Sequence, residues 1–399
     1  MTDNQARELS AGVNQHGVRD HNERLILSML QRHGALAGSD LSRKAGLSPQ
    51  TVSVILRGLE SDGLLRRGEP QRGKIGKPSI PMGINPEGAF SLGLKIGRRS
   101  ADVIIVDFEG TVRQVIHTAY HYPTPQAILA FLGEGLRQAE DYLGAEKYGR
   151  IAGIGVATPF EIWRWHDTIG APADEMDKWR DFSLQDEIAK ITDLPVFVQN
   201  DATAACRAEH AYGSGRQYRD YAYFYLGAFI GGGIVLNNSI FDGPTNNAGA
   251  FGSLPVMSDK GGKPKQLIDV ASLYLLEQQL VEHGINPLRL WQARDNWSDY
   301  TDQVNDWIET TAPYIAQAAL TVCAVVDFEA VMIDGAMPKD VRAKLVEKVA
   351  EAIVDLDDRG ITAPKIVEGN MGLDARSRGA ASTPINAKYF LNSHGQMGS

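Results

Sequence analysis

Cysteine is scarce in this sequence: Cys206 and Cys323 are the only two in 399 residues, and they lie far apart. Two distant cysteines exclude a disulfide framework and a cysteine-rich zinc cluster. Long apolar runs are also missing, since none approaches the roughly 20 residues of a membrane span. The opening residues, MTDNQARELS, are polar and have no signal-peptide core. Together these absences predict a cytoplasmic protein.

Positive and negative charges are distributed unevenly along the chain. Residues 1–85 contain 12 Lys and Arg against 8 Asp and Glu, whereas the remaining residues contain 28 against 41, which together give the net charge of −9. A basic first segment on an acidic body predicts that only the N-terminal part meets a polyanion. The length allows two or three domains, and a hydrophobic share of 43% is typical of globular proteins.

Three short helical patterns occupy the basic segment. Apolar positions in 21–34 repeat at helical spacing and end at a glycine. We expect a second helix that is capped by Ser39 and ends at Gly46. Ser48 is expected to cap a third helix, with Pro49 at its first helical position.

Two short extended runs around a Gly- and Pro-rich turn follow, in LLRRGEPQRGKIGKPSIPMGI. Residues 1–85 are therefore predicted to form a winged helix-turn-helix that binds duplex DNA, with small polar side chains reaching base edges and wing cations neutralising phosphates. The predicted DNA contacts are Ser48, Gln50, Thr51, Ser53 and Arg57 on the third helix and Arg66, Arg67, Arg72, Lys74 and Lys77 on the wing. The alternative is a three-helix packing module whose charges are merely solvated.

From about residue 86, apolar runs alternate with helical patterns, which predicts an α/β body with two sheets. The predicted strands are 90–96, 103–107, 151–156, 195–199, 221–226, 231–236 and 329–334. The predicted helices are 125–143, 182–192, 201–212, 267–283, 303–326 and 338–356. A strand–glycine turn–strand pattern opens each half, at 92–107 and at 221–236, as a weak internal repeat.

Six stretches of this body carry a resemblance to one family. They are GLKIG, GIGVATPFE, LPVFVQNDATAA, LGAFIGGGIVLN, NNAGAFGSLPV and DFEAVMIDGAMPK. In this order, behind a winged helix, they resemble the ROK family of repressors and sugar kinases over nearly the whole chain. The resemblance implies an actin-like, two-lobed sensor. We therefore expect a first lobe at 86–200, a second lobe with the ligand cleft and dimerisation surface at 201–390, and a tail at 391–399.

The first hairpin departs from the kinases that this resemblance suggests. Those kinases carry an acid in a D-x-G-G-T phosphate turn, which helps to hold magnesium, whereas this sequence has Lys95, Arg98 and Arg99 there. A lysine repels the metal and the arginines fill the space, so we expect no ATP as cofactor. The cations are either a solvated turn, partners for acids in the body, or partners for an anionic effector. The glycines 231–233 of the second hairpin could be retained for chain geometry alone.

Asn200 and Asp201 match the Asn-Asp pair that grips the sugar in the family, where the aspartate is also the base of the kinases. The pair could instead cap the helix 201–212, and the two roles can coexist. The family's E-x-G-H phrase is AFGS at 250–253, so its Glu and its zinc-binding His are lost, and the loop that follows has no Cys or His. We therefore expect no zinc.

The remaining predicted effector contacts are Thr158, Glu161, Trp163, Asn247, Ser253 and Asp269. A tryptophan beside a carboxylate, as in Trp163 and Glu161, suits a pyranose or polyol, whose apolar faces stack on rings. Ordinary packing around an inter-domain loop explains that tryptophan equally well. Asp269 stands near the place of the family's acidic sugar ligand, one residue out of its usual spacing.

The combination predicts a sugar-responsive transcriptional regulator, a repressor of sugar uptake or catabolism genes, without enzymatic activity. A sugar or polyol in the degenerate kinase cleft would close the lobes and weaken operator binding. A homodimer would read two half-sites of the DNA. Two alternatives remain: an active ROK sugar kinase with a fused DNA-binding domain, and a DNA-binding protein with a dead sensor.

Overall fold

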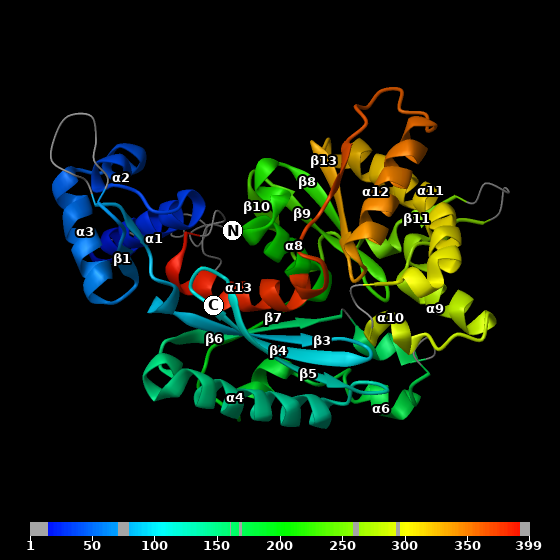
Figure 1. Cartoon of the computed structure of the whole chain (residues 1–399), viewed down its shortest axis with the longest axis horizontal. Coiled ribbons are helices and arrows are strands. Elements are labelled where there is room, and N and C mark those ends of the chain that lie inside the picture. Colours follow the sequence, from blue (N-terminus) through cyan, green and yellow to red (C-terminus); the bar gives the residue numbers. More distant parts are fainter. Residues whose placement is uncertain are drawn as a thin grey trace, which may run out of the picture.

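The computed structural model describes residues 15–70, 80–159, 161–166, 170–257, 263–292 and 296–391. They form an N-terminal helical domain followed by two α/β lobes (Figure 1). The predicted wing contacts Arg72, Lys74 and Lys77 lie outside the described residues. Among the helices of the described ranges, none is both long and apolar enough to cross a lipid bilayer.

The N-terminal domain is the predicted winged helix-turn-helix. Its elements are α1 (Gln15–His33), α2 (Gly38–Ala45), α3 (Pro49–Ser61), β1 (Leu65–Arg67) and β2 (Met82–Ile84), with β1 antiparallel to β2. Apolar side chains of all three helices, among them Leu30, Leu41 and Val52, are buried in one core. The same core includes Ile104 of the first lobe and Ile385 near the C-terminus, so the domain packs directly against the rest of the molecule.

The helix ends in this domain follow the sequence signals with one exception. Ser48 caps α3 as expected, because its side chain accepts a hydrogen bond from the Thr51 amide at 3.1 Å. Gly46 ends α2 in the left-handed conformation, at φ 66°. The expected cap at Ser39 is wrong: α2 begins at Gly38, so Ser39 lies inside its first turn.

The first lobe is built on a five-stranded sheet with the order β5-β4-β3-β6-β7. The strands are β3 (Phe90–Ile96), β4 (Ser100–Asp107), β5 (Val112–Ala119), β6 (Ile151–Thr158) and β7 (Val196–Asn200). β3, β4 and β5 form an antiparallel meander, and β6 and β7 run parallel to β3. The helices of this lobe are α4 (Pro125–Tyr148), α6 (Ala173–Asp177) and α7 (Leu184–Ala189).

The second lobe repeats this topology. Its sheet has the order β10-β9-β8-β13-β14, with strands β8 (Tyr221–Leu226), β9 (Ile230–Leu236), β10 (Ser239–Phe241), β13 (Ala330–Gly335) and β14 (Lys365–Glu368). β8, β9 and β10 again form an antiparallel meander, and β13 and β14 run parallel to β8. The weak internal repeat read from the two hairpins is thus a repeat of the whole sheet.

Helices cover both faces of the second sheet. They are α8 (Asp201–Tyr212), α9 (Leu273–Glu282), α10 (Leu288–Gln292), α11 (Thr301–Val326) and α12 (Lys339–Val354). Two short strands, β11 (Pro255–Val256) and β12 (Lys265–Gln266), pair with each other in an antiparallel ribbon. Alternate residues of β8 face different cores: Phe224 packs with α11 and α12, whereas Tyr223 packs with α8. The helix expected over 267–283 is interrupted, because Leu267–Asp269 forms a tight 3-10 turn before α9.

A further helix, α13 (Ala375–Tyr389), was not predicted from the sequence. It belongs to the segment expected in the second lobe, yet it packs across β3 and β6 of the first sheet and crosses α8. Figure 1 shows α13 and α4 on opposite faces of that sheet. The crossings are close, since a β-carbon at Gly155 of β6 would overlap Ala380 and one at Gly379 would overlap Ala204 of α8. α13 therefore lies in the middle of the molecule, wedged between the two lobes.

Candidate functional site

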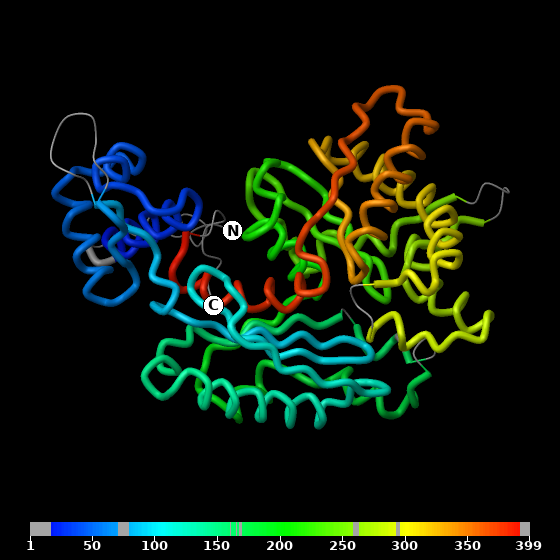
Figure 2. Tube along the Cα trace, viewed as in Figure 1, coloured from blue at the N-terminus to red at the C-terminus, as the bar shows by residue number. Residues whose placement is uncertain are grey.

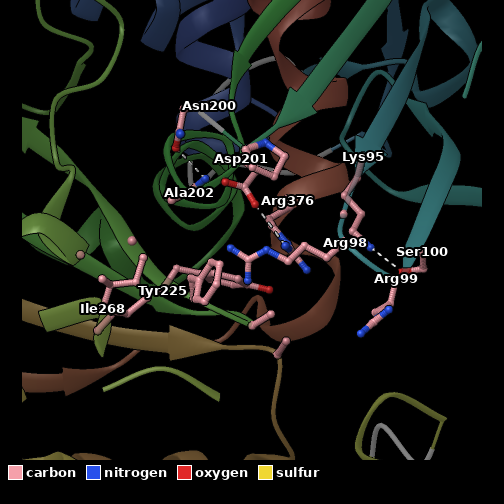
Figure 3. A pocket seen from close by; sticks show the side chains of 18 of the residues that line it. Lys95, Arg98, Arg99, Ser100, Asn200, Asp201, Ala202, Tyr225, Ile268 and Arg376 are labelled. Carbon is pink, nitrogen blue, oxygen red and sulfur yellow. Dashed lines mark hydrogen bonds and ion pairs between the residues drawn. The ribbon is translucent and has the colours of Figure 1, made fainter. Parts of the chain in front are cut away.

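A cavity of about 750 Å³ lies between the two lobes. Its wall is formed by the β3–β4 hairpin, the start of α8, the β8–β9 hairpin, residues 247–253 and the first turn of α13. This volume falls in the range of small-molecule sites, and the position between two domains is usual for them. Figure 3 shows the charged part of the wall, where Arg98, Asp201 and Arg376 lie close together and Lys95 points to Ser100.

Lys95 of the first hairpin is paired with an acid of the same hairpin. Its ammonium group lies 3.0 Å from the Asp102 carboxylate and also donates to Ser100 at 2.9 Å. The register of β3 and β4 places Lys95 directly opposite Asp102. Burial alone would raise the pKa of Asp102, but Lys95 and His117, whose Nδ1 lies 2.5 Å away, lower it below the usual range. The place of the expected magnesium-holding acid is therefore taken by an internal ion pair.

Arg98 and Arg99 follow Lys95 at the tip of the hairpin and both line the cavity. Arg99 donates to the carbonyl oxygen of His121 at 2.5 Å. The guanidinium of Arg98 lies over the ring of Phe229, from the opposite lobe, and close to Asp201 and Arg376. Burial lowers the pKa of Arg98 to about 9, so its side chain is protonated at neutral pH. Two charged guanidinium groups thus face the cavity from one turn.

Asn200 and Asp201 lie at the junction of β7 and α8. One caps the helix, and the other forms an ion pair in the cavity wall. Asn200 is the helix cap, because its side chain accepts hydrogen bonds from the amides of Ala202 and Thr203. Asp201 lines the cavity and accepts a hydrogen bond from Arg376 of α13 at 3.1 Å. The two side chains are only 19% and 13% exposed, so this ion pair is largely shielded from solvent.

The glycines of the second hairpin have a packing reason to be there. A β-carbon at Gly231 would come within 2.9 Å of the Ala202 side chain, and one at Gly233 within 2.5 Å of Cys206. Both neighbours belong to α8, which lies against β9. Close helix–strand packing therefore accounts for these glycines without a nucleotide.

The predicted effector contacts are only partly brought together. Glu161, Asn200, Asp201, Asn247 and Ser253 line the cavity. Thr158, Trp163 and Asp269 do not: Trp163 packs against the first-lobe core, and Asp269 is exposed beside the wall residue Ile268. The alternative of ordinary packing therefore describes Trp163 in this structure. The effector contacts themselves stay predictions.

Sequence reasoning missed the groups that α13 and the second lobe add to the wall. Arg376 of α13, Tyr225 of β8 and Trp291 of α10 all line the cavity. Burial would lower the pKa of Arg376, but Tyr225 and Asp201 raise it above the usual value. Arg376 lies 175 residues after Asp201 in the sequence, and no local pattern predicts that the two side chains pair.

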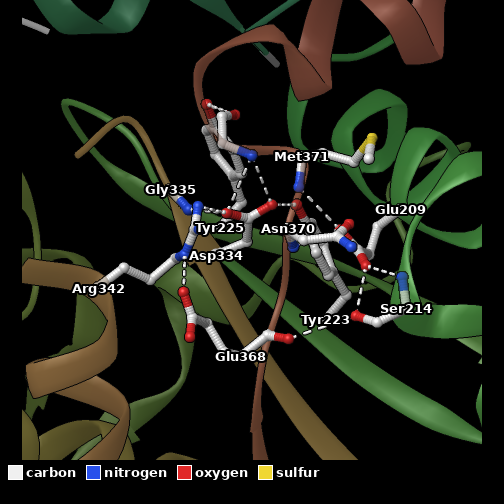
Figure 4. Close-up of polar contacts among 11 residues, drawn as sticks. Glu209, Ser214, Tyr223, Tyr225, Asp334, Gly335, Arg342, Glu368, Asn370 and Met371 are labelled. Carbon is white, nitrogen blue, oxygen red and sulfur yellow. Dashed lines mark hydrogen bonds and ion pairs between the residues drawn. The ribbon is translucent and has the colours of Figure 1, made fainter. Parts of the chain in front are cut away.

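A second polar cluster fixes the segment that leads into α13 (Figure 4). Glu209 of α8 is fully buried and accepts hydrogen bonds from the amides of Asn370 and Met371. Asp334 of β13 is also fully buried, accepts from the amide of Gly372, and pairs with Arg342 at 2.8 Å. Burial raises the pKa of Asp334 despite this partner. The start of α13 is thereby tied to the second lobe by two buried carboxylates.

The predicted DNA-contact residues within the described ranges lie on the surface of the N-terminal domain. Gln50, Ser53 and Arg57 are exposed on one face of α3, and Val54, which sequence reasoning missed, is 55% exposed beside them. Arg66 is exposed on β1, with Glu109 at 3.9 Å. Arg67 forms a bidentate ion pair with Glu60 of α3, at 2.6 and 3.0 Å. Arg66 is therefore the more available of the two cations described on the wing.

No metal-binding cluster of three or more His, Cys, Asp or Glu side chains occurs in the part of the chain that the structure describes. Cys206 and Cys323 are both buried and unbridged, and burial raises the pKa of both thiols. The absence of zinc and of ATP stays a prediction.

Two family models match the chain. The model described as the ROK family covers residues 91–383, and the model described as winged helix-turn-helix DNA-binding covers residues 19–66. The first match spans both lobes and includes most of α13, and the second spans α1 to β1.

Relatives include both repressors and kinases. The xylose repressor of Bacillus spizizenii is 24% identical over 239 residues, which cover 60% of this chain and 61% of that protein. A solved ROK family transcriptional regulator, described as a homologue of the E. coli MLC protein, is 20% identical with a TM-score of 0.67 over 93% of this chain and 97% of its own. A ROK glucokinase from Streptomyces griseus in complex with glucose and AMPPNP is 20% identical, with a TM-score of 0.58 over 74% and 98%. At these identities the solved structures show the shared fold alone.

Proposed function

Because this chain belongs to the ROK family and carries a winged helix-turn-helix domain, we propose that it is a transcriptional regulator whose affinity for operator DNA is controlled by a small sugar or polyol in the cavity. One observation supports this proposal most strongly. A single helix, α13, has its first turn in the cavity wall and its last turn on the DNA-binding domain.

The far end of α13 holds α1 through polar and apolar contacts. Arg24 of α1 donates to the carbonyl oxygen of Ala387 at 3.1 Å, and Ser28 accepts from the amide of Leu391 at 2.9 Å. Ile385 and Phe390 share a core with the apolar residues of α1. Figure 2 shows this C-terminal segment, in red, reaching from the middle of the molecule to the blue N-terminal domain. A 15-residue helix spans about 22 Å, enough to reach from one site to the other.

This connection supplies a physical route for regulation. The start of α13 is tied to the second lobe through Glu209 and Asp334, while its body packs on the first sheet. A ligand that changes the angle between the lobes must strain or shift the helix, and α1 shifts with it. Regulation then follows from unequal ligand affinity for the two arrangements. We expect the ligand-bound arrangement to bind the operator less tightly, as in a repressor of sugar uptake or catabolism genes.

The relatives favour regulation over catalysis for this chain. The solved regulator matches 93% of this chain, whereas the glucokinase matches 74% of it. Lys95 stands where the family's kinases carry an acid, and its ammonium group, which pairs with Asp102, offers no oxygen ligand to Mg²⁺. We therefore propose that phosphotransfer has been lost. Two copies of the chain would read two half-sites of an operator.

A sugar kinase with a fused DNA-binding domain is the second candidate, because Asp201 is retained in the cavity and the kinase fold is intact. One experiment separates the two. Full-length protein selects its operator from a library of duplexes, and the complex is then titrated with a panel of sugars, with and without ATP·Mg²⁺. Release of DNA by a sugar that is recovered unphosphorylated supports regulation. ATP-dependent conversion of the sugar would show a kinase and refute the proposal.

A further inference from the structure

The charges that line the cavity are not balanced. Its wall carries five cationic side chains and three carboxylates in the described residues, an excess of two positive charges when the histidines His117 and His121 are counted as neutral. The cations are Lys95, Arg98, Arg99, Arg164 and Arg376, and the acids are Asp102, Glu161 and Asp201. The chain from residue 86 onward is strongly acidic, so this excess is opposite in sign to its surroundings.

Each of the three carboxylates already has a cationic partner in the wall. Asp102 pairs with Lys95 at 3.0 Å and Asp201 with Arg376 at 3.1 Å. Glu161 pairs with Arg164 at 3.0 Å. Arg98 and Arg99 add two further positive charges at the tip of the first hairpin, where Arg98 also lies near Asp201 and over the Phe229 ring.

The next acid outward does not remove the excess. Glu277 of α9 lies near Arg98 and Arg99, and Trp291 donates to its carboxyl at 2.5 Å. Burial raises the pKa of Glu277, which favours the neutral acid. Even with Glu277 counted as charged, one positive charge remains in excess.

Two guanidinium groups lie next to each other in this part of the wall. Arg98 reaches from the hairpin to the Asp201–Arg376 pair, and each of these two residues affects its pKa (Figure 3). The two guanidinium groups repel one another and share Asp201 as a counter-charge, so a further anion beside them would still be attracted. Guanidinium groups suit phosphate and carboxylate because their planar donors match two oxygens at once.

The opposite side of the cavity has a different character. Asn247, Ser253 and Gln266 supply neutral donors and acceptors, and Trp291 and Ile268 supply apolar surface. Hydroxyl groups and the apolar face of a sugar ring fit such a wall. The cavity therefore has a cationic end at the first hairpin and a neutral polar end in the second lobe.

We propose that the natural effector is an anionic sugar derivative, a sugar phosphate or a sugar acid, whose charged group binds between Arg98, Arg99 and Arg376. This inference rests on the proposed regulatory function and adds to it the chemical class of the effector. The cationic turn at 95–99 then holds the anion of the effector, in the position where the family's kinases hold the phosphates of a nucleotide.

The first test uses inorganic phosphate as a probe of the charged end alone. Full-length protein is melted at constant ionic strength, with phosphate replacing chloride. We expect a saturable rise in melting temperature that Arg98→Gln abolishes and Arg98→Lys partly retains. Arg180→Gln, an exposed arginine paired with Asp177 away from the cavity, is the control and should respond as the wild type does. If Arg98→Gln does not fold, Arg99→Gln carries the same test. An equal response of wild type and variant, or no response in either, overturns the anion site.

The second test uses matched sugars that differ only at one carbon: glucose, glucuronate and glucose 6-phosphate, and the corresponding galactose and mannose series. In the series that binds, we expect the anionic members to bind roughly ten- to a hundred-fold more tightly than the neutral one, with the difference lost in Arg98→Gln. Glucuronate against glucose 6-phosphate tells a carboxylate from a phosphate ester.

Different results would refute the anionic effector and the proposed regulatory function. If neutral sugars bind as tightly as their anionic forms and release DNA, the inference is wrong and the proposed function stands. If no sugar of either kind changes DNA binding, or if the protein phosphorylates a neutral sugar, the proposed function fails and the inference fails with it.

Discussion

Replacement of Arg24 by methionine tests the connection between cavity and DNA-binding domain without touching either site. Arg24 lies on α1, where its guanidinium donates to the carbonyl of Ala387 at the end of α13 and pairs with Asp20 at 3.1 Å. Its side chain is 26% exposed. Methionine keeps the helix propensity and the aliphatic stem but removes the charged donor.

The magnitude follows from the contact. A hydrogen bond from a charged donor contributes about 1.5–3 kcal/mol, and partial exposure reduces this to about 1 kcal/mol. Coupling free energies between two sites are typically about 1–3 kcal/mol. Loss of one of the two polar links between α1 and α13 should therefore reduce the sugar-induced change in operator affinity by roughly five-fold. The affinity for the sugar should stay as in the wild type, because the cavity is unaltered.

The assay is operator binding by fluorescence anisotropy, with and without the sugar that releases the wild-type protein. Arg19→Met is the matched control, since Arg19 is on the same helix and its guanidinium pairs with Glu23 of that helix at 2.8 Å. The control should keep the full sugar response. A sugar response in Arg24→Met equal to that of the wild type would refute α13 as the connection.

Four further predictions concern the separate sites. Arg66→Ala should weaken binding to all duplexes and reduce the salt dependence by roughly one unit of slope, measured by titrations at several salt concentrations. Gln50→Ala should instead change which base pairs are preferred in a selection from random duplexes, with little change in the salt slope. Asp201→Asn should lower the melting temperature by several degrees, because Arg376 loses a counter-charge worth about 1–3 kcal/mol at this degree of burial, whereas α8 keeps its cap at Asn200; an unchanged melting temperature would contradict the importance of this pair. Lys95→Asp should not create kinase activity in an ATP-coupled assay, because it places a second acid beside Asp102 and leaves both arginines of the turn in the cavity.

The sequence predicted the elements whose burial pattern is regular. The strands of both sheets that lie in the interior were found because they are near-continuous apolar runs, as expected when both faces are covered. β5 was missed because it is an edge strand whose residues alternate between partly buried and exposed, so that it contains no apolar run. The helix caps at Ser48 and Asn200 could be predicted from the sequence, because capping depends on residues two or three apart.

α13 was missed for a physical reason that also explains its role. Its sequence, ARSRGAASTPINAKY, is rich in small residues and has Pro384 inside, and it has no apolar stripe because it is enclosed on several sides. Small residues such as Gly379 allow the close crossing with α8. The helix that joins the two sites is thus the one that amphipathic periodicity cannot detect.

The candidate site was predictable only where it is local. The opposition of Lys95 and Asp102 follows from the hairpin register, although seven residues separate them. The pairing of Asp201 with Arg376 joins elements that meet only when both lobes and α13 are assembled. Trp163 has a side chain suited to stacking on a sugar but packs against the first-lobe core, since burial of a large aromatic side chain competes with a role in the cavity.

The central claim is that occupation of the cavity changes the affinity of the winged helix for DNA. Its most direct test measures the dissociation constant of the full-length protein for its selected operator at increasing concentrations of one sugar whose binding is followed in the same samples. The account predicts that the operator dissociation constant rises at least several-fold, that the rise saturates together with sugar binding, and that the sugar is recovered unchanged in the presence of ATP. A sugar that saturates the cavity while the operator dissociation constant stays constant would contradict it.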